Sequence, residues 1–448
     1  MVVDQLNVER LGIPTVTIPT SEFVGLARDT VRSEGAAEAP FAVIPHPVAG
    51  IGDADLRAKV DSLFPQILSA ATAWKPASTE LAPQKQPYPA DVFKVTGTVA
   101  DVNKMFMSRK WSIGLPIYPP TPERLAEMLK GTSRNPDEIL GQVPPRMATL
   151  TVELVAVHAA MAGCKPEYMP VLLAIVEALL EPKANWLGVN TSTGTLGLMI
   201  VINGPVVKEL GIGSGQGAAG KANHPNSSMG YAVNLVAAIV GGSRPPDGDK
   251  STFGGPQDFV PWIFGENEDR LPKGWPPYHV DRGFKRTDSV VSVLGIYPPV
   301  DLTDHWSRTV QENLSAWASL ATPRINAGGV CRPPMALTPY FVVLGPEHAQ
   351  MAARAGWGKD QFRKAFWEEV RQPISWYPKP CIDYIKEVPE YKLAFEKAYG
   401  LPFSGETLLP VTAKPELIHI VIGGGSGRHS HFFTPFYETV PVSKLVKE

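Results

Sequence analysis

Two short apolar segments near the start of the chain limit the folds that this region can adopt. Residues 13–18 (IPTVTI) and 41–45 (FAVIP) are rich in β-branched residues, which is typical of short buried strands. Helical patterns follow each of them, at 20–31 and at 54–74, the second interrupted at Pro65. This strand–helix–strand–helix order predicts part of a parallel, doubly wound layer.

Two strands are too few for a stable parallel layer, because such layers normally hold more strands and are covered on both faces. The helices themselves are well marked, since Thr20 or Ser21 can cap the first and Asp53 can cap the second. We therefore expect the missing strands to come from another chain or from the rest of this one.

Charge, hydropathy and cysteine spacing exclude several classes of protein. The 448 residues carry 42 basic and 44 acidic side chains, so no basic excess favours a nucleic acid or a membrane surface as partner. No apolar run is long enough for a transmembrane helix, and residues 1–12 lack the pattern of a signal peptide. The three cysteines form neither a disulfide framework nor a CxxC motif, so we expect a cytoplasmic protein.

A proline-rich polar stretch divides the chain. Residues 76–92 are predicted to link a partial, flavodoxin-like α/β segment at 1–75 to a large α+β domain at 93–448. The clearest predicted elements of the large domain are helices at 121–132 and 148–164 and strands at 197–202, 289–296 and 341–346. Ten tryptophans with only 19% charged residues also favour a buried subunit interface.

A glycine-rich loop follows an apolar strand that ends at Ile422. In residues 423–427 (GGGSG), backbone amides such as that of Gly424 can hold an anion. Arg428 can bind a carboxylate through two hydrogen bonds, Ser430 can add another, and His429 can transfer a proton. The alternative is a tight turn that leaves its histidines facing solvent.

A second glycine-rich loop (GIGSGQGAAG, residues 211–220) precedes a predicted helix. Ser214, Asn223 and His224 are candidates for binding an anion there, together with the free amides at the start of the helix. The spacing matches neither a dinucleotide-binding fingerprint nor a P-loop, so nucleotide binding is not expected. The alternative is a loop without a ligand.

Three further residues are candidates for chemistry. Cys164, in a turn between apolar helices, can be a nucleophile or resolving thiol, or a small buried residue that closes the helix pair. His348 can be a general base oriented by Glu347, or the two can simply begin a helix. The spacing of Glu266 and His279 is not diagnostic of a metal, so no metal site is predicted.

Several stretches resemble the UGSC family. Residues 11–68 resemble the part of the UGSC domain that follows its Sec-Gly-Ser-Cys or Cys-Gly-Ser-Cys turn, and VIPHP is distantly similar to the selenocysteine subunit of the glycine and betaine reductases. The remaining chain resembles long members of the family in its WSIGLPIYPPTPERLAEMLKGT, MAGCKPEYMPVLLAIVEALL, VINGP, GENE, VVLGPEHAQMAARAGWGKDQFR and VIGGGSGRHSHFF stretches.

The resemblance implies a redox-active thiol or selenol pair, which none of the three cysteines restores. It therefore suggests either a small CxxC-type partner that carries the pair and completes the first layer, or a lineage that lost the motif, with no cofactor held by this chain itself. The incomplete first layer favours the partner. Such a hetero-oligomer would cleave a carbon–heteroatom bond of a small anionic substrate reductively or by elimination. The alternatives are a redox-neutral lyase or hydrolase, and a non-catalytic scaffold subunit that binds substrate.

Overall fold

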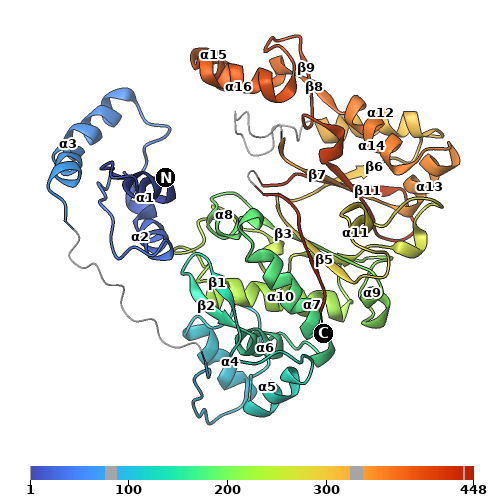
Figure 1. The fold of residues 1–448 in the computed structure, drawn as a ribbon, viewed down its shortest axis with the longest axis horizontal. Coiled ribbons are helices and arrows are strands. Elements are labelled where there is room, and N and C mark those ends of the chain that lie inside the picture. Colours follow the sequence, from blue (N-terminus) through green and yellow to red (C-terminus); the bar gives the residue numbers. More distant parts are fainter. Residues whose placement is uncertain (1, 76–87, 323–336, 437–438, 448) are drawn as a thin grey trace.

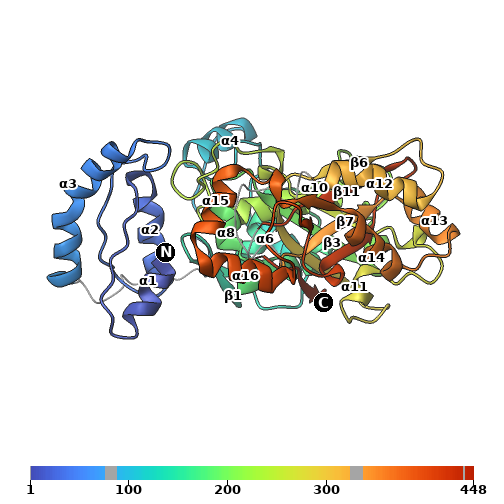
Figure 2. The same ribbon diagram turned by 90° about the horizontal axis from the view of Figure 1, so that it is seen from above.

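The protein has a mixed α/β fold, in which a small N-terminal unit lies beside a larger domain (Figures 1 and 2). The computed structural model describes residues 2–75, 88–322, 337–436 and 439–447. The two units touch where the ammonium of Lys250 donates a hydrogen bond to the Glu22 carbonyl (2.6 Å) and lies over the ring of Phe23 (5.5 Å). Most of the predicted linker, residues 76–87, lies outside the described residues.

The N-terminal unit contains three helices, α1 (Val2–Glu9), α2 (Val24–Ser33) and α3 (Asp53–Thr72). The two predicted strands run parallel, as expected, but they are reduced to the isolated bridges Thr17–Phe41 and Thr20–Ile44. Within the described residues these segments pair only with each other. The layer therefore leaves the outer edges of both segments unpaired.

Three local expectations for this unit are wrong. Thr20 and Ser21 do not cap α2, because their hydroxyl groups bond to the ring (3.1 Å) and the backbone amide (3.2 Å) of His46. Pro65 does not interrupt α3, which is continuous on both sides of it. Asp53 is the first residue of that helix, and Gly52 occupies the cap position.

The larger domain is built on two four-stranded sheets, both of mixed direction. The first has the order β12-β5-β3-β4 and the second the order β10-β7-β11-β6. Their bounds are β3 (Gly197–Asn203), β4 (Trp262–Gly265), β5 (Val290–Ile296), β12 (Val442–Leu445), β6 (Val300–Thr303), β7 (Tyr340–Leu344), β10 (Ile418–Ile422) and β11 (His429–Phe433).

The two sheets face each other, and helices cover their outer faces, which gives four layers (Figure 1). On the first sheet lie α6 (Val152–Met161), α7 (Met169–Leu179) and α10 (His224–Leu235). On the second lie α12 (Val310–Ala321), α13 (Pro346–Arg354) and α14 (Lys359–Glu369). Side chains such as Val201, Phe341 and Phe433 fill the inner layer between the sheets. The core of the domain is therefore divided by its sheets into three buried layers.

The remaining elements surround these layers. They are α4 (Val99–Ser108), α5 (Pro122–Leu129), β1 (Ile139–Val143), β2 (Ala148–Thr151), α8 (Trp186–Thr191), α9 (Val206–Glu209), α11 (Tyr278–Asp281), β8 (Arg371–Pro373), α15 (Lys379–Glu387), α16 (Pro389–Tyr399) and β9 (Leu408–Pro410). Cys381, on α15, is disulfide-bonded, which its spacing in the sequence did not predict.

One predicted helix begins later than expected. Residues 148–151 form the strand β2, and the side chain of Thr151 then caps α6 by accepting a hydrogen bond from the Leu154 amide (3.2 Å). A threonine at this position ends the extended segment and starts the helix, because its hydroxyl satisfies an otherwise free amide. The strand predicted at 197–202 and the one at 289–296 are both present.

Candidate functional site

The two glycine-rich loops meet at the edge of the inner layer and enclose a cavity of about 470 Å³. One loop precedes α10, and the other joins β10 to β11. The walls are side chains from both sheets, namely Trp262, Phe264, Val343, His429, His431 and Phe433. Loops that lie two hundred residues apart in the chain thus share one site.

Backbone contacts hold the loops against each other. The Gly424 amide donates to the Ser214 carbonyl (3.0 Å), and the side-chain amide of Asn267 donates to the Gly424 carbonyl (2.9 Å). At the next position only glycine fits, because a Cβ atom on Gly425 would lie 2.2 Å from Oε1 and 2.8 Å from Cα of Gln216. The close approach of the two loops therefore depends on this glycine.

The first loop is shaped by Asn226, a buried residue of α10. Its Nδ2 donates to the carbonyls of Gly213 (3.1 Å) and Ala218 (2.9 Å), and to that of Ile263 on β4 (3.0 Å). Its Oδ1 accepts a hydrogen bond from the Gly213 amide (2.9 Å). One side chain therefore ties both ends of the loop to the first sheet.

Alternation along β11 decides which of its residues reach the cavity. His429, His431 and Phe433 line it, whereas Ser430 and Phe432 point to the opposite, helix-covered face. Successive side chains of a strand point to opposite faces of the sheet. The two histidines therefore share a face with the inner layer.

His429 is paired with a carboxylate at the wall of the cavity. Its Nδ1 lies 2.8 Å from Oδ2 and 3.1 Å from Oδ1 of Asp301, on the neighbouring strand β6. When Nδ1 carries the proton and donates it to the carboxylate, Nε2 is left as a proton acceptor. The edge of the His305 ring packs against the His429 ring (centroids 5.2 Å apart). This arrangement suits general acid–base chemistry.

His431 is a second, more buried histidine of the cavity. Burial lowers the pKa of its ring, the positive form of His429 lowers it further, and Asp301 acts in the opposite direction. His431 is therefore neutral near pH 7. Phe433 packs edge-on against Trp262 (5.8 Å), so this wall of the cavity is aromatic.

Two amides of the second loop are free to bind a ligand. Among the described residues, no group accepts a hydrogen bond from the amides of Gly425 and Ser426, which both line the cavity. The next amide, that of Gly427, donates to Oε1 of Glu347 (2.9 Å). Adjacent backbone amides of this kind bind carboxylate and other anionic groups.

The N-terminal unit, with its three helices and its two parallel bridges, relates the chain to a known family. Residues 1–73 match the UGSC family. No curated protein and no solved structure matches the chain. The UGSC match covers α1, α2, α3 and the two bridges, and every residue that lines the cavity lies outside it.

A long, apolar helix that could cross a membrane is absent from the described ranges, inside and outside the UGSC match. The same ranges contain no group of three or more His, Cys, Asp or Glu side chains that could hold a metal ion.

Outside the UGSC match, Arg428, which was predicted to bind the substrate, contacts the segment that follows β6. Its Nη2 donates to the Ser307 carbonyl (2.7 Å) and lies 3.8 Å from Oδ2 of Asp304, a buried carboxylate. Arg428 is not among the residues that line the cavity. Its guanidinium therefore contacts the segment 304–307 and not the cavity.

Ser430 and His348 are also turned away from the cavity. Each is 1% exposed, and a 2.9 Å hydrogen bond joins the Ser430 hydroxyl to Nδ1 of His348. Burial, with a contribution from Arg428, lowers the pKa of His348 to about 4. The ring packs on Trp317 (4.7 Å), so His348 is part of the buried core beneath the second sheet. Glu347, its predicted partner, instead orients the loop at Gly427.

The other predicted residues gather at a separate place. Cys164 is buried, and burial raises the pKa of its thiol to about 12, which favours the neutral thiol. Asn223 caps α10 by accepting from the Asn226 amide (3.1 Å), and His224 is exposed, with Nδ1 3.4 Å from the Tyr168 hydroxyl. Of the four predicted catalytic residues, only His429 lines the cavity.

Glu266 has a structural role between the sheets. Its buried carboxylate accepts hydrogen bonds from the Ile422 amide (3.0 Å), the Tyr278 amide (2.6 Å) and Nδ2 of Asn203 (2.6 Å). Burial raises its pKa, and the charge of Lys359 acts in the opposite direction. These bonds connect the ends of β3 and β10 to α11 behind the second glycine loop.

Proposed function

We propose that this chain is an enzyme that acts on a small anionic substrate by general acid–base catalysis in the cavity between the sheets. The observation that carries the proposal is the pairing of His429 with Asp301 at a cavity whose rim offers two free amides. The substrate carboxylate would bind the amides of Gly425 and Ser426. Its body would lie against the aromatic wall formed by Trp262 and Phe433.

The chemistry that fits these groups is a redox-neutral elimination or hydrolysis. In an elimination, Nε2 of His429 takes a proton from the carbon next to the carboxylate. The electron pair of that C–H bond forms the double bond, and the heteroatom leaves with its own bonding pair. His429 then returns the proton to the leaving group, while Asp301 stabilises the transient imidazolium.

A panel of small carboxylates that carry a sulfur, nitrogen or halide leaving group tests the proposal. We expect wild-type protein to release the leaving group from at least one of them, and His429→Gln to lower kcat by about 10²–10⁴-fold. His224→Gln, which changes an exposed histidine outside the cavity, is the matched control and should retain activity. Turnover that survives in His429→Gln, or that is equal for a carboxylate and its neutral amide, would contradict the proposal. So would a His429 NMR signal that no carboxylate perturbs.

A second candidate is the subunit role implied by the UGSC match, and the unpaired edges of residues 13–20 and 41–44 favour it. A small partner with a CxxC-type thiol or selenol pair would add strands to this layer. Its two chalcogens would deliver two electrons and two protons, so that the carbon–heteroatom bond becomes C–H and the released group is protonated. The partner would leave as the disulfide or selenenyl sulfide.

The test of this candidate uses the intact complex. Mass spectrometry of the co-purified assembly should find a small chain with a CxxC-type motif, and cross-links from it should map to residues 13–20 or 41–44. Blocking its thiols with iodoacetamide should abolish turnover of the panel. If this chain alone turns substrate over at the same rate, the redox partner is dispensable, and the acid–base proposal stands by itself.

A further inference from the structure

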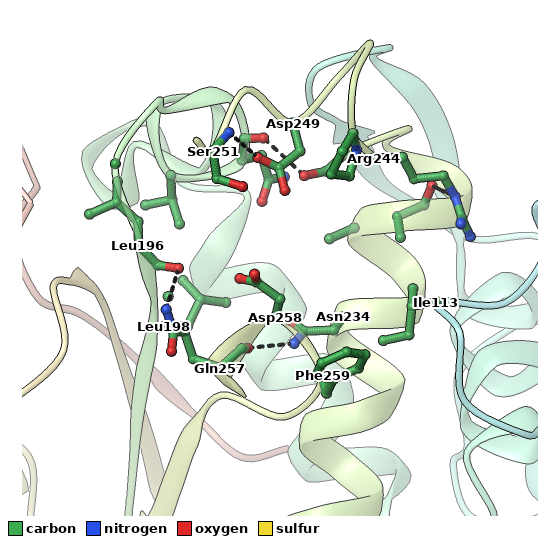
Figure 3. Close-up of a pocket in the computed structure, with 18 of the residues that line it drawn as sticks. Ile113, Leu196, Leu198, Asn234, Arg244, Asp249, Ser251, Gln257, Asp258 and Phe259 are labelled. Carbon is green, nitrogen blue, oxygen red and sulfur yellow. Dashed lines mark hydrogen bonds between the residues drawn. The ribbon is translucent and has the colours of Figure 1, made fainter. Parts of the chain in front are cut away.

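A second cavity, of about 400 Å³, lies in the larger domain (Figure 3). It shares no lining residue with the cavity between the glycine loops. Its walls come from the start of β3, from α10 and the helical turn that follows it, and from the segment 243–259. It is therefore a separate site, independent of the proposed active site.

Part of the wall of this cavity is apolar, and part of it is held in place by amide side chains. Ile113, Leu196, Leu198 and Phe259 line it, and Figure 3 shows them around the central space. Nδ2 of Asn234 donates to the Gln257 carbonyl (2.9 Å), and Nε2 of Gln257 donates to the Leu196 carbonyl (3.3 Å). These bonds fix the first turn of the 256–258 segment against α10 and β3.

Two carboxylates face the same space. Figure 3 places Asp249 and Asp258 on the upper and lower sides of the cavity, with Ser251 beside Asp249. One oxygen of each carboxylate accepts a backbone hydrogen bond, from the amides of Ser251 (2.7 Å) and Gly255 (2.7 Å). Burial raises the pKa of Asp258, and the one charged neighbour that acts on it is the like-charged Asp249. The remaining carboxylate oxygens are thus open to a ligand.

Two basic residues, Lys110 and Arg244, line this cavity, and Arg244 is turned away from its carboxylates. Nε of Arg244 donates to the Ala238 carbonyl (3.1 Å), and Figure 3 shows its side chain turned away from the two carboxylates. Lys250, outside the lining, donates to the carbonyls of Glu22 (2.6 Å) and Pro246 (2.7 Å), and the lining residue Lys110 is exposed to solvent. Among the described residues, no basic group forms an ion pair with Asp249 or Asp258.

A hydrogen-bond acceptor without a partner among the described residues also lies at this site. Gln257 is only 7% exposed, and its Oε1 accepts no hydrogen bond from any described residue. The wall also contains Ala237 and Ala238 of a π-helical turn (Val236–Val240), a rare geometry that occurs frequently at functional sites.

We infer that this second cavity binds a small organic cation, a protonated amine with an apolar body. An ammonium group carries three donors, which would meet Asp249, Asp258 and Oε1 of Gln257. Its hydrocarbon part would lie against the leucines and Phe259. A divalent metal fits less well, because the described residues contain no cluster of three or more ligating side chains.

The experiment compares amines with neutral molecules of the same shape. Benzylamine and cyclohexylamine, both protonated at pH 7, are titrated against benzyl alcohol and cyclohexanol by saturation-transfer NMR and calorimetry on the full chain. We expect the amines to bind about tenfold or more tighter than the alcohols, since the paired charges are partly desolvated. Asp258→Asn should remove that preference. Asp247→Asn, which changes an exposed carboxylate of the same segment outside the cavity, should leave it unchanged.

Each other outcome overturns the inference. Equal binding of amines and alcohols shows an apolar cavity without charge recognition, and the absence of amine binding at millimolar concentration shows no cation site. A preference that survives in Asp258→Asn places the amine elsewhere. Binding of Mg²⁺ or Ca²⁺ that displaces the amine identifies a metal site. If Asp258→Asn does not fold, Asp249→Asn makes the same comparison, because Asp249 faces the cavity from the other side.

Discussion

The Nδ1 atom of His429 lies 2.8 Å from the Oδ2 atom of Asp301, across the antiparallel pair of β11 and β6. The residue directly opposite Asp301 is His431, and His429 pairs with Thr303, so the contact runs diagonally between the strands. Diagonal neighbours on one face of a sheet lie within reach of long side chains. Both histidines and the carboxylate therefore share the face that lines the cavity.

Removing the charge of Asp301 should change the protonation pattern of His429 without unfolding the protein. In Asp301→Asn we expect that the ring proton of His429 is no longer fixed at Nδ1. Turnover should fall by about 10²–10⁴-fold. The change in unfolding free energy should stay below about 1 kcal/mol, because the pair is half-exposed. The ¹⁵N shifts of the ring and a urea titration measure both effects. Unchanged ¹⁵N shifts would show that Asp301 does not orient the ring.

The sequence predicted one half of this pair and missed the other. His429 stood out because it follows a glycine-rich loop at the end of an apolar strand. Asp301 lies on a four-residue strand just after two prolines, which is too short for a period-two pattern to be recognised. Nothing in the local sequence of Arg428 shows that Asp304 and the Ser307 carbonyl would contact its guanidinium.

The elements of the larger domain were more predictable than their arrangement. Strands such as 197–203 and 290–296 are continuous apolar runs, because both of their faces are buried in a four-layer fold. The two glycine-rich loops meet because of the way the two sheets pack on each other, and local sequence patterns do not predict that packing. For the same reason, the sequence could not show that His348, on α13, packs against Trp317 of α12 while His429 lines the cavity.

Gly425 should tolerate no side chain. In Gly425→Ala the new methyl group would overlap the backbone of Gln216, so the loops must separate. We expect a loss of stability of about 1–3 kcal/mol and loss of carboxylate binding. Gly215→Ala is the matched control, since its Cβ would meet nothing within 4 Å. Chemical denaturation and NMR titration with a carboxylate distinguish the two variants, and equal behaviour would disprove the close approach of the loops.

Removing the side chain of Glu266 should lower the free energy of unfolding more than most single substitutions do. Glu266→Ala leaves two backbone amides without their acceptor in a buried region, and leaves Nδ2 of Asn203 with only its bond to Oε1 of Glu268 (3.2 Å). The expected loss is about 3–5 kcal/mol, the range for breaking a buried charged network. Glu209→Ala, at an exposed glutamate, should change stability by less than about 0.5 kcal/mol. A loss below about 1 kcal/mol in Glu266→Ala would show that the sheets are held together without it.

Acid should destabilise the protein through its buried histidines. The folded-state pKa of His348 is lowered from 6.5 to about 4, so the folded state binds fewer protons than the unfolded state between these values. Stability is therefore full above pH 6.5 and falls as the pH drops towards 4, by up to about 3 kcal/mol for this residue. His348→Gln should show a smaller loss between pH 7 and pH 4.5 in urea titrations. His305→Gln, at an exposed histidine, should lose as much stability as wild type over the same range.

Substitutions at two neighbouring residues of α3 should distinguish packing within the N-terminal unit from binding of a partner chain. Leu63 is 3% exposed and packs on Ile44, whereas Phe64 is 58% exposed and lies in line with the exposed Val60 and Leu68. Leu63→Ala should cost about 2–5 kcal/mol, because it leaves a cavity in the N-terminal core. Phe64→Glu should leave the unfolding free energy within about 0.5 kcal/mol and weaken recovery of the CxxC-type partner in the intact complex. If Phe64→Glu destabilises the chain as much as Leu63→Ala, then this face of α3 is packed within the chain, and a partner must bind elsewhere.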